Sequence, residues 1–256
     1  MGHVLAVVSQ KGGVGKTSTV VNLGAAFARR GLKTLVVDSD PQGAVRYGIA
    51  LKKGQAAIGF ADYLAGTHAL RDVILSTALP WLKVMLVGTV SDATNHEAYL
   101  NRVATGVHMD ELLAAARTRC DIVVVDTPPG LGPITRAVLT HSERALVPLQ
   151  CEPLALQTTP QILRGLQSMV DANPTLALDG ILLTMYEAGN AACERTAEYI
   201  RGHVPSNLLI DIVIPRSAAI ADAFAAGQPA VLREPADAAS QAYVNLATKL
   251  AERFPK

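Results

Sequence analysis

A glycine-rich loop directly after the first apolar run of the chain carries residues that could bind phosphate. Gly12, Gly13 and Gly15 allow the backbone to fold tightly, so that its N–H groups can point inward at an anion. Lys16 adds a mobile positive charge for β- and γ-phosphates, and Thr17 offers a hydroxyl to a Mg²⁺ ion that bridges them. Because a helical pattern follows, we predict a nucleotide phosphate site; the alternative is a turn whose glycines serve only packing.

The same loop departs from the usual phosphate-loop pattern in two ways. Gln10 stands five residues before Gly15, where that pattern has a glycine, and Lys11 adds a second lysine. Lys11 lies too far round the loop to duplicate Lys16 easily, but it could reach a phosphate in a neighbouring subunit; the alternative is a solvated loop lysine. The predicted nucleotide-binding residues of the loop are Lys11, Gly12, Gly13, Val14, Gly15, Lys16, Thr17 and Ser18.

Three aspartates, Asp38, Asp40 and Asp126, come at the ends of apolar runs. A carboxylate at the end of a buried strand is unfavourable unless something pairs with it, and Mg²⁺-nucleotide is the natural partner. We expect Asp126 to hold the ion through its water shell and Asp38 to support the ion's surroundings, so the predicted metal site is Thr17, Asp38 and Asp126. Helix N-capping is the alternative for each aspartate; it fits Asp38 best and Asp126 least.

Short apolar runs alternate with helical patterns along the whole chain, which predicts an α/β fold with a doubly wound, mostly parallel sheet and helices on both faces. Ligands of such sheets bind beyond the carboxyl ends of the strands. No composition shift marks a linker, so we expect a single domain over residues 1–256, least regular over 43–101. The predicted strands are 4–8, 34–37, 83–87, 122–125, 145–149, 181–183 and 209–214, and the predicted helices are 16–30, 109–117, 160–170, 193–203 and 236–254.

Composition fits a folded protein of modest charge. Half of the 256 residues are hydrophobic and 18% are charged, which excludes disorder, and the net charge of +1 argues against a strongly basic nucleic-acid scaffold. Three cysteines are too few and too far apart for a disulfide framework, so we expect a cytoplasmic protein. No run approaches the length of a membrane span, and the N-terminus does not have the pattern of a signal peptide.

Six segments in the same order resemble the ParA/MinD family of dimerising ATPases, whose phosphate loop is a deviant Walker A motif. Lys11–Thr17 is similar to that loop, Val37–Gly43 to the motif Val-Asp-x-Asp-Pro-Gln-Gly, and Val124–Pro129 to the Walker B strand and switch. Three further segments resemble the ParA branch in particular: Pro148–Glu152, Gly180–Tyr186 and Val213–Arg216.

The resemblance implies ATP and Mg²⁺ as cofactors and a homodimer that sandwiches the nucleotide. It implies that Lys11 enters the partner's site and that Asp40 positions or activates the attacking water, which makes Lys11, Lys16 and Asp40 the expected catalytic residues. It also places Pro215 and Ser217 against the adenine ring, although a strand-ending proline with a helix-capping serine is the plainer interpretation. Residues 128–132, which suit neither a strand nor a helix, are the expected switch.

ParA-like proteins bind DNA without sequence preference and position plasmids, chromosomes or other cargo, with hydrolysis stimulated by a ParB-like or other activating protein. Arg216 matches one DNA-binding position of that family. A second arginine is lost where Glu187, Ala188 and Gly189 stand, and a third beyond Arg216, where Ser217 is followed by alanines. We therefore expect a partitioning ATPase, associated with the nucleoid if it binds DNA.

Three other interpretations stay open from the sequence. A MinD-like membrane-associated ATPase needs a C-terminal amphipathic helix, and the stripe of Tyr243, Leu246, Ala247 and Leu250 is short, so docking onto the sheet explains it better. An orphan ParA that positions a protein cargo shares the same core. A metabolic enzyme or the iron protein of a reductase shares the deviant loop; it would need a cysteine soon after Asp126 to hold a cluster, and the first is Cys151.

Overall fold

The computed structural model describes residues 2–51, 58–90, 93–105 and 107–254. One eight-stranded sheet runs through it in the order β3-β4-β2-β5-β1-β6-β7-β8, and every pairing is parallel except that of the short edge strand β3. The predicted fold class is confirmed. The strands are β1 His3–Val7, β2 Thr34–Asp38, β3 Leu75–Ser76, β4 Leu82–Met85, β5 Ile122–Asp126, β6 Arg144–Gln150, β7 Ala177–Tyr186 and β8 Leu209–Pro215.

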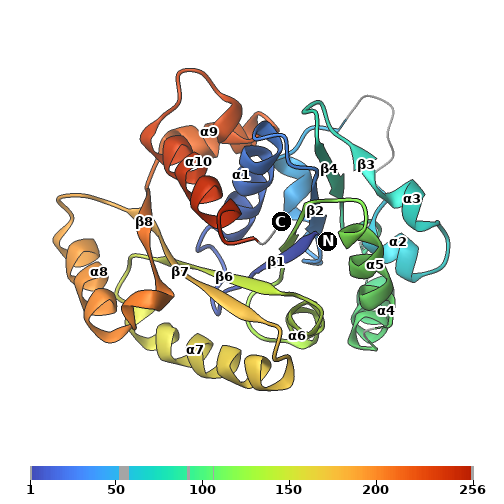
Figure 1. The fold of residues 1–256 in the computed structure, drawn as a ribbon, viewed down its shortest axis with the longest axis horizontal. Helices are drawn as coiled ribbons and strands as arrows, with labels where there is room; N and C mark the ends of the chain where they lie inside the picture. The colour runs from blue at the N-terminus through green and yellow to red at the C-terminus, as the bar shows by residue number, and fades with distance from the viewer. Residues whose placement is uncertain (1, 52–57, 91–92, 106, 255–256) are drawn as a thin grey trace.

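Helices cover both faces of this sheet (Figure 1). The ones with more than eight residues are α1 Lys16–Arg29, α4 Ala93–Ala104, α5 Val107–Arg117, α7 Ala155–Ala172, α8 Ala191–His203 and α10 Ala238–Ala251. The shorter ones are α2 Phe60–Leu64, α3 Leu70–Val73, α6 Pro133–Thr140, α9 Ala218–Ala225 and the 3₁₀ turns η1 Ala44–Tyr47, η2 Ser206–Leu208 and η3 Ala230–Leu232.

Successive side chains of each central strand enter two separate cores. In β5, Val123 and Val125 pack with α2 and α4 to α8, whereas Ile122 and Val124 pack with α1 and α10. Since both faces of a parallel sheet are buried, its strands must be apolar throughout, which is why short apolar runs predicted them correctly.

Several helices differ from the sequence prediction, and three of them illustrate why. The helix expected from Pro160 begins at Ala155, so the proline lies inside α7. The twelve-residue α4 begins within the stretch expected to be least regular. Gly132 precedes α6, whose first residue is Pro133; proline is favoured there because the first N–H of a helix has no intrahelical partner.

The C-terminal helix α10 docks onto the sheet face that α1 also covers. Its stripe of Tyr243, Leu246, Ala247 and Leu250 is at most 2% exposed, and the Tyr243 hydroxyl lies 3.2 Å from the Thr19 hydroxyl of α1. The predicted docking is confirmed. Among the described helices, none is long and apolar enough to cross a membrane.

Strand register brings the predicted carboxylates together. Asp38 ends β2 and Asp126 ends β5, and the two residues are direct neighbours in the ladder. On the other side of β5, Val7 ends β1 and pairs with Asp126, so the loop that follows β1 leaves the sheet beside both aspartates. The candidate site is therefore built at the carboxyl ends of β1, β2 and β5.

Candidate functional site

The loop between β1 and α1 has the backbone conformation that a phosphate cradle requires. Gly13 and Gly15 have φ values of 78° and 88°, in the left-handed region that favours glycine. Gly15 is the N-cap residue of α1, and no side chain of the described residues caps that end. The first N–H groups of α1 therefore point to the loop together with the positive end of the helix dipole, as in other helix-terminal anion sites.

Lys16 is held inside this loop. Its ammonium donates a hydrogen bond to the Ser9 hydroxyl at 3.0 Å, and that hydroxyl donates to the Lys11 carbonyl at 2.7 Å. Lys16 is 6% exposed, and burial lowers its pKa, although the charges of Asp126 and Asp40 partly oppose the shift. A buried ammonium beside a helix start that no side chain of the described residues caps suits the binding of an anion.

Thr17 and Asp126 form the part of the site that suits a divalent cation. The Thr17 hydroxyl donates to Asp126 Oδ2 at 2.7 Å, while Asp126 Oδ1 is buried and has no hydrogen-bond partner among the described residues. Burial raises the pKa of Asp126 to about 7. An unpartnered carboxylate oxygen beside a hydroxyl is a donor set that Mg²⁺ and its water shell prefer, so the residues fit the predicted ion.

Asp38 supports the backbone next to this pair. It is fully buried, and its two oxygens accept hydrogen bonds from the N–H groups of Asp40 and Val45, both at 3.1 Å. The bond to Val45, in the first turn of η1, partly matches the capping alternative. Burial and the charge of Asp126 raise the pKa of Asp38 well above its usual value.

Asp40 is half-buried at the rim of the site. Its Oδ1 accepts from the Gln42 N–H at 2.9 Å, which fixes the side chain in a turn after β2. Tyr99 of α4, which the sequence analysis did not single out, donates from its hydroxyl to the Ser39 carbonyl at 2.8 Å. This bond anchors the segment between Asp38 and Asp40 from the face of α4.

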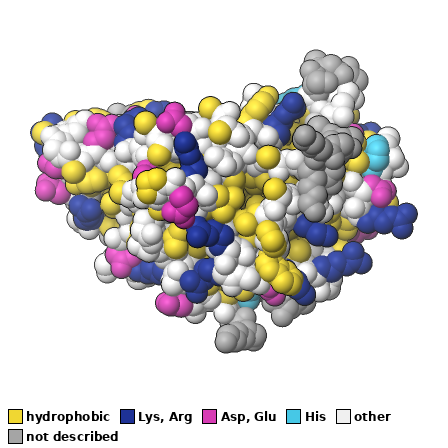
Figure 2. Space-filling view, turned by 90° about the horizontal axis from the view of Figure 1, so that it is seen from above, with side chains coloured by type: hydrophobic (Ala, Val, Ile, Leu, Met, Phe, Trp, Pro, Cys, Tyr) yellow, Lys and Arg dark blue, Asp and Glu magenta, His cyan; other side chains and the backbone are white. Residues whose placement is uncertain are grey.

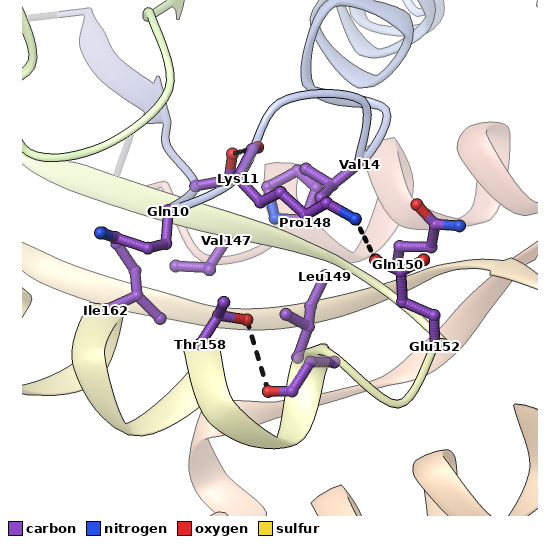
Figure 3. A pocket seen from close by; sticks show the side chains of 12 residues that line it. Gln10, Lys11, Val14, Val147, Pro148, Leu149, Gln150, Glu152, Thr158 and Ile162 are labelled. Carbon is purple, nitrogen blue, oxygen red and sulfur yellow. Dashed lines mark hydrogen bonds and ion pairs between the residues drawn. The ribbon is translucent and has the colours of Figure 1, made fainter.

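Lys11 has a charged partner within the chain. Its ammonium forms an ion pair with Glu152, just beyond β6, and the two side chains are 40% and 28% exposed (Figure 3). Figure 3 shows the lysine extending from the loop across the end of β6, next to a small pocket whose lining includes Val14 and Pro148. Glu152 was not predicted as a site residue. The sequence signal that could have indicated it is its position just after the end of a predicted strand, at the edge of the sheet where ligands bind.

Two further contacts tie the loop to neighbouring segments. The Thr184 hydroxyl of β7 donates to the Val14 carbonyl at 2.8 Å. The Gly130 N–H donates to the Ser9 carbonyl at 2.8 Å, which joins the predicted switch, residues 128–132, to the same serine that holds Lys16. This hydrogen bond connects the phosphate loop directly to residues 128–132. Ser18, also predicted, is half-buried in the first turn of α1.

The C-terminal predicted residues lie at the end of β8, two strands away from β6. Ser217 caps α9 by accepting from the Ala219 N–H at 3.1 Å and also hydrogen-bonds Asp237. Ser217 is therefore a helix-capping serine, as the alternative to an adenine contact expected. The contact of Pro215 and Ser217 with adenine stays a prediction. Arg216, more than half exposed, forms an ion pair with Glu187.

The comparisons with known proteins agree with this geometry. The family described as AAA domain (AAA_31) matches residues 2–178. The chromosome partitioning protein ParA of Caulobacter vibrioides is 35% identical over 255 residues, covering 98% of this chain and 94% of the relative. The chain belongs to the ParA/MinD family of ATPases. The sporulation initiation inhibitor protein Soj of Bacillus subtilis is 33% identical over 256 residues, covering 98% and 99% of the two chains.

Solved structures extend the agreement to the fold. Cobyrinic acid a,c-diamide synthase from Mycobacterium smegmatis, solved with ADP and magnesium, superposes with a TM-score of 0.81 at 28% identity, covering 99% of this chain and 96% of the other. The septum site-determining protein MinD of Pyrococcus horikoshii, complexed with Mg-ADP, gives 0.80 at 26% identity, with both chains fully covered. The family resemblance predicted from the sequence is confirmed.

The raised pKa of Asp126 predicts a pH-dependent stability in magnesium-free protein. The folded state keeps a proton up to about pH 7 that the unfolded state releases near 3.8, so stability falls as pH rises between these values. Asp126→Asn should therefore raise the thermal unfolding midpoint with EDTA at about pH 8, and the gain should shrink towards about pH 5. Scanning fluorimetry measures both, with the exposed Asp222→Asn as control. A variant less stable than the wild type at both pH values would contradict this interpretation.

Proposed function

We propose that this chain is a Mg²⁺-dependent ATPase that dimerises around ATP, binds DNA without sequence preference, and positions or segregates DNA or another cargo. Hydrolysis, accelerated by a ParB-like or other activating protein, returns it to the monomer. The observation that carries the proposal is the phosphate loop with its buried Lys16, next to an Asp126 oxygen that has no partner among the described residues.

The described residues divide the work of ATP binding and hydrolysis. The N–H groups of residues 12–17 and the Lys16 ammonium bind the phosphates, and Thr17 with Asp126 holds Mg²⁺, which neutralises phosphate charge when bound. Asp38 keeps Asp40 in place through a backbone hydrogen bond, and Asp40, at the rim, orients the attacking water. ADP and magnesium in the similar MinD and synthase structures support this assignment.

Lys11 is the proposed link between nucleotide and dimer. In the isolated chain it is paired with Glu152, and both side chains remain partly exposed, so the lysine can exchange this carboxylate for a phosphate of the partner subunit. An ammonium that moves between a carboxylate and a triphosphate gives ATP a higher affinity for the dimer than for the monomer. ATP thus shifts the population towards the dimer, and hydrolysis reverses the shift.

The proposed DNA binding depends on a surface with little excess positive charge. Arg216 is exposed, but its ion pair with Glu187 neutralises it in the isolated chain. On the face shown in Figure 2, Lys and Arg side chains are interspersed with acidic and hydrophobic ones. We therefore propose weak, salt-sensitive binding that dimerisation strengthens, because two copies double the number of phosphate contacts.

A second candidate is an orphan ParA that positions a protein cargo, which the weak basic surface favours. The MinD-like alternative, binding to a membrane through α10, has less support. The apolar stripe of that helix already packs against α1 and the sheet, so it would have to detach before it entered lipid.

Lys11→Ala should bind ATP as a monomer but fail to dimerise, because the exchanged ammonium is gone. Sedimentation velocity with Mg²⁺ and ATP, compared with ADP, measures the dimer, and a fluorescent ATP analogue measures binding. Lys16→Ala is the matched control and should lose ATP binding itself. A normal ATP-dependent dimer of Lys11→Ala would refute the role of Lys11 across the interface.

Asp40→Ala should accumulate the ATP-bound dimer, because nucleotide binding survives while the attacking water is no longer oriented. We expect phosphate release to fall by about 100-fold, within the usual range for losing a general base, with the dimer persisting in sedimentation. An ATP-loaded variant that stays monomeric, or that hydrolyses ATP at the wild-type rate, would disprove the role of Asp40.

For DNA, two substitutions of one ion pair should act in opposite directions. Arg216→Glu should weaken retention of non-specific duplex at low salt, whereas Glu187→Gln should strengthen it by releasing Arg216, by about two- to tenfold for one phosphate contact. Electrophoretic mobility shifts with ATP, across a salt series, measure both effects. Unchanged retention of DNA by both variants would show that Arg216 does not contact DNA and would favour a protein cargo.

A further inference from the structure

A cleft at the opposite edge of the sheet has no role in the site described above. It has a volume of about 690 Å³ and lies at the amino ends of β2 and β4, where its lining includes Thr34 and Leu82. β2 runs from Thr34 to Asp38, so the cleft is separated from the predicted metal site by the length of that strand, about 13 Å at 3.3 Å per residue. Nucleotide bound at the phosphate loop therefore does not occupy it.

Three of the four cations that line this cleft form no ion pair among the described residues. Lys33, Lys83 and Arg119 are all exposed and line it, and none of the ion pairs found among the described residues involves them. Lys33 precedes β2, Lys83 lies on the neighbouring β4, where it pairs with Leu35, and Arg119 precedes β5 on the other side of β2, so the three lie at the amino ends of adjacent strands. The Asp121 carboxylate lies at the same edge and accepts a hydrogen bond from the Lys33 backbone N–H at 2.7 Å. Converging unpaired cations beside a cleft suit a phosphate or a paired carboxylate group.

The rest of the cleft offers an apolar floor and an aromatic ring. Leu35 and Leu82, both at most 3% exposed, form part of the floor. Trp81 also lines the cleft; its side chain is 56% exposed, and its φ of 67° lies in the left-handed region that bulky residues rarely adopt. The Trp81 carbonyl accepts from the Thr34 N–H at 2.8 Å, so this backbone conformation is fixed by the neighbouring strand.

We propose that this cleft binds a small aromatic organic phosphate, of the size of a mononucleotide, whose ring packs on Trp81 and whose phosphate lies among Lys33, Lys83 and Arg119. The charges select the anion, the exposed indole selects a flat ring, and the volume falls in the range of small-molecule sites. This site is separate from the phosphate loop and does not depend on the function proposed above.

Trp81 is the single tryptophan of the chain, so its fluorescence reports on the cleft. The test is a titration of wild-type protein, kept in saturating Mg-ADP, with guanosine monophosphate, inorganic phosphate, guanosine and a short oligothymidylate. Guanosine monophosphate should quench the fluorescence saturably and bind about tenfold more tightly than inorganic phosphate or guanosine. Equilibrium dialysis should count one additional molecule per chain.

Lys83→Glu combined with Arg119→Glu should weaken that binding by at least about tenfold, since two contacts to the phosphate are reversed. The matched control is Arg102→Glu, an exposed cation on α4 outside the cleft lining, which should bind as the wild type does. Circular dichroism melting checks that the double variant folds.

Three results would overturn the proposal. They are the absence of saturable quenching by guanosine monophosphate, equal binding of inorganic phosphate, and unchanged binding by the folded double variant. Tighter binding of the oligothymidylate than of the mononucleotide would replace the small-molecule site with a nucleic-acid surface. The double variant separates this cleft from the phosphate loop, because Lys83 and Arg119 line the cleft and not the loop, so the results do not depend on whether that loop binds or hydrolyses ATP.

Discussion

Buried charge at the carboxyl edge of the sheet is the constraint on which the structure depends. Asp38 and Asp126 are fully buried and adjacent in the strand ladder, and Lys16 is 6% exposed beside them. Burial raises the pKa of both aspartates and lowers that of Lys16, so it disfavours the charged form of each group, and the attraction between Lys16 and Asp126 offsets only part of this cost. A Mg²⁺-triphosphate supplies both signs at once. The fold holds these groups in place because helices pack on both faces of the apolar strands.

The same edge carries the residues that we propose connect the nucleotide to dimerisation and to the predicted switch. Ser9 accepts the Lys16 hydrogen bond through its side chain and the Gly130 hydrogen bond through its carbonyl, so the loop and the predicted switch share one residue. Lys11 lies on the outer side of that loop, paired with Glu152. A site that is destabilised when empty, with one lysine held at its rim, is suited to a protein whose assembly follows its nucleotide, since ligand binding relieves the repulsion and stabilises the bound form.

Much of the fold and of the phosphate site could be predicted because their signals are local. Four- and five-residue apolar runs mark strands buried on both faces, and aspartates at their ends must meet at one edge of a parallel sheet. The pairing of Lys11 with Glu152 could not be predicted in the same way, because the two residues are 141 positions apart and either looks like a solvated charge alone. The same holds for Arg216 and Glu187. The start of α7 could not be predicted because proline favours the first turn of a helix, whereas Pro160 lies inside this one.

Calorimetric titration of the wild-type chain with ATP, at about pH 8 where Asp126 is ionised, tests the central claim most directly. With Mg²⁺ present the affinity should exceed that in EDTA by at least about tenfold, because the ion is needed to pair the buried carboxylate with the phosphates. Equal affinities with and without Mg²⁺, or no ATP binding at all, would contradict the account, because Asp126 would then not hold the ion that we propose it binds.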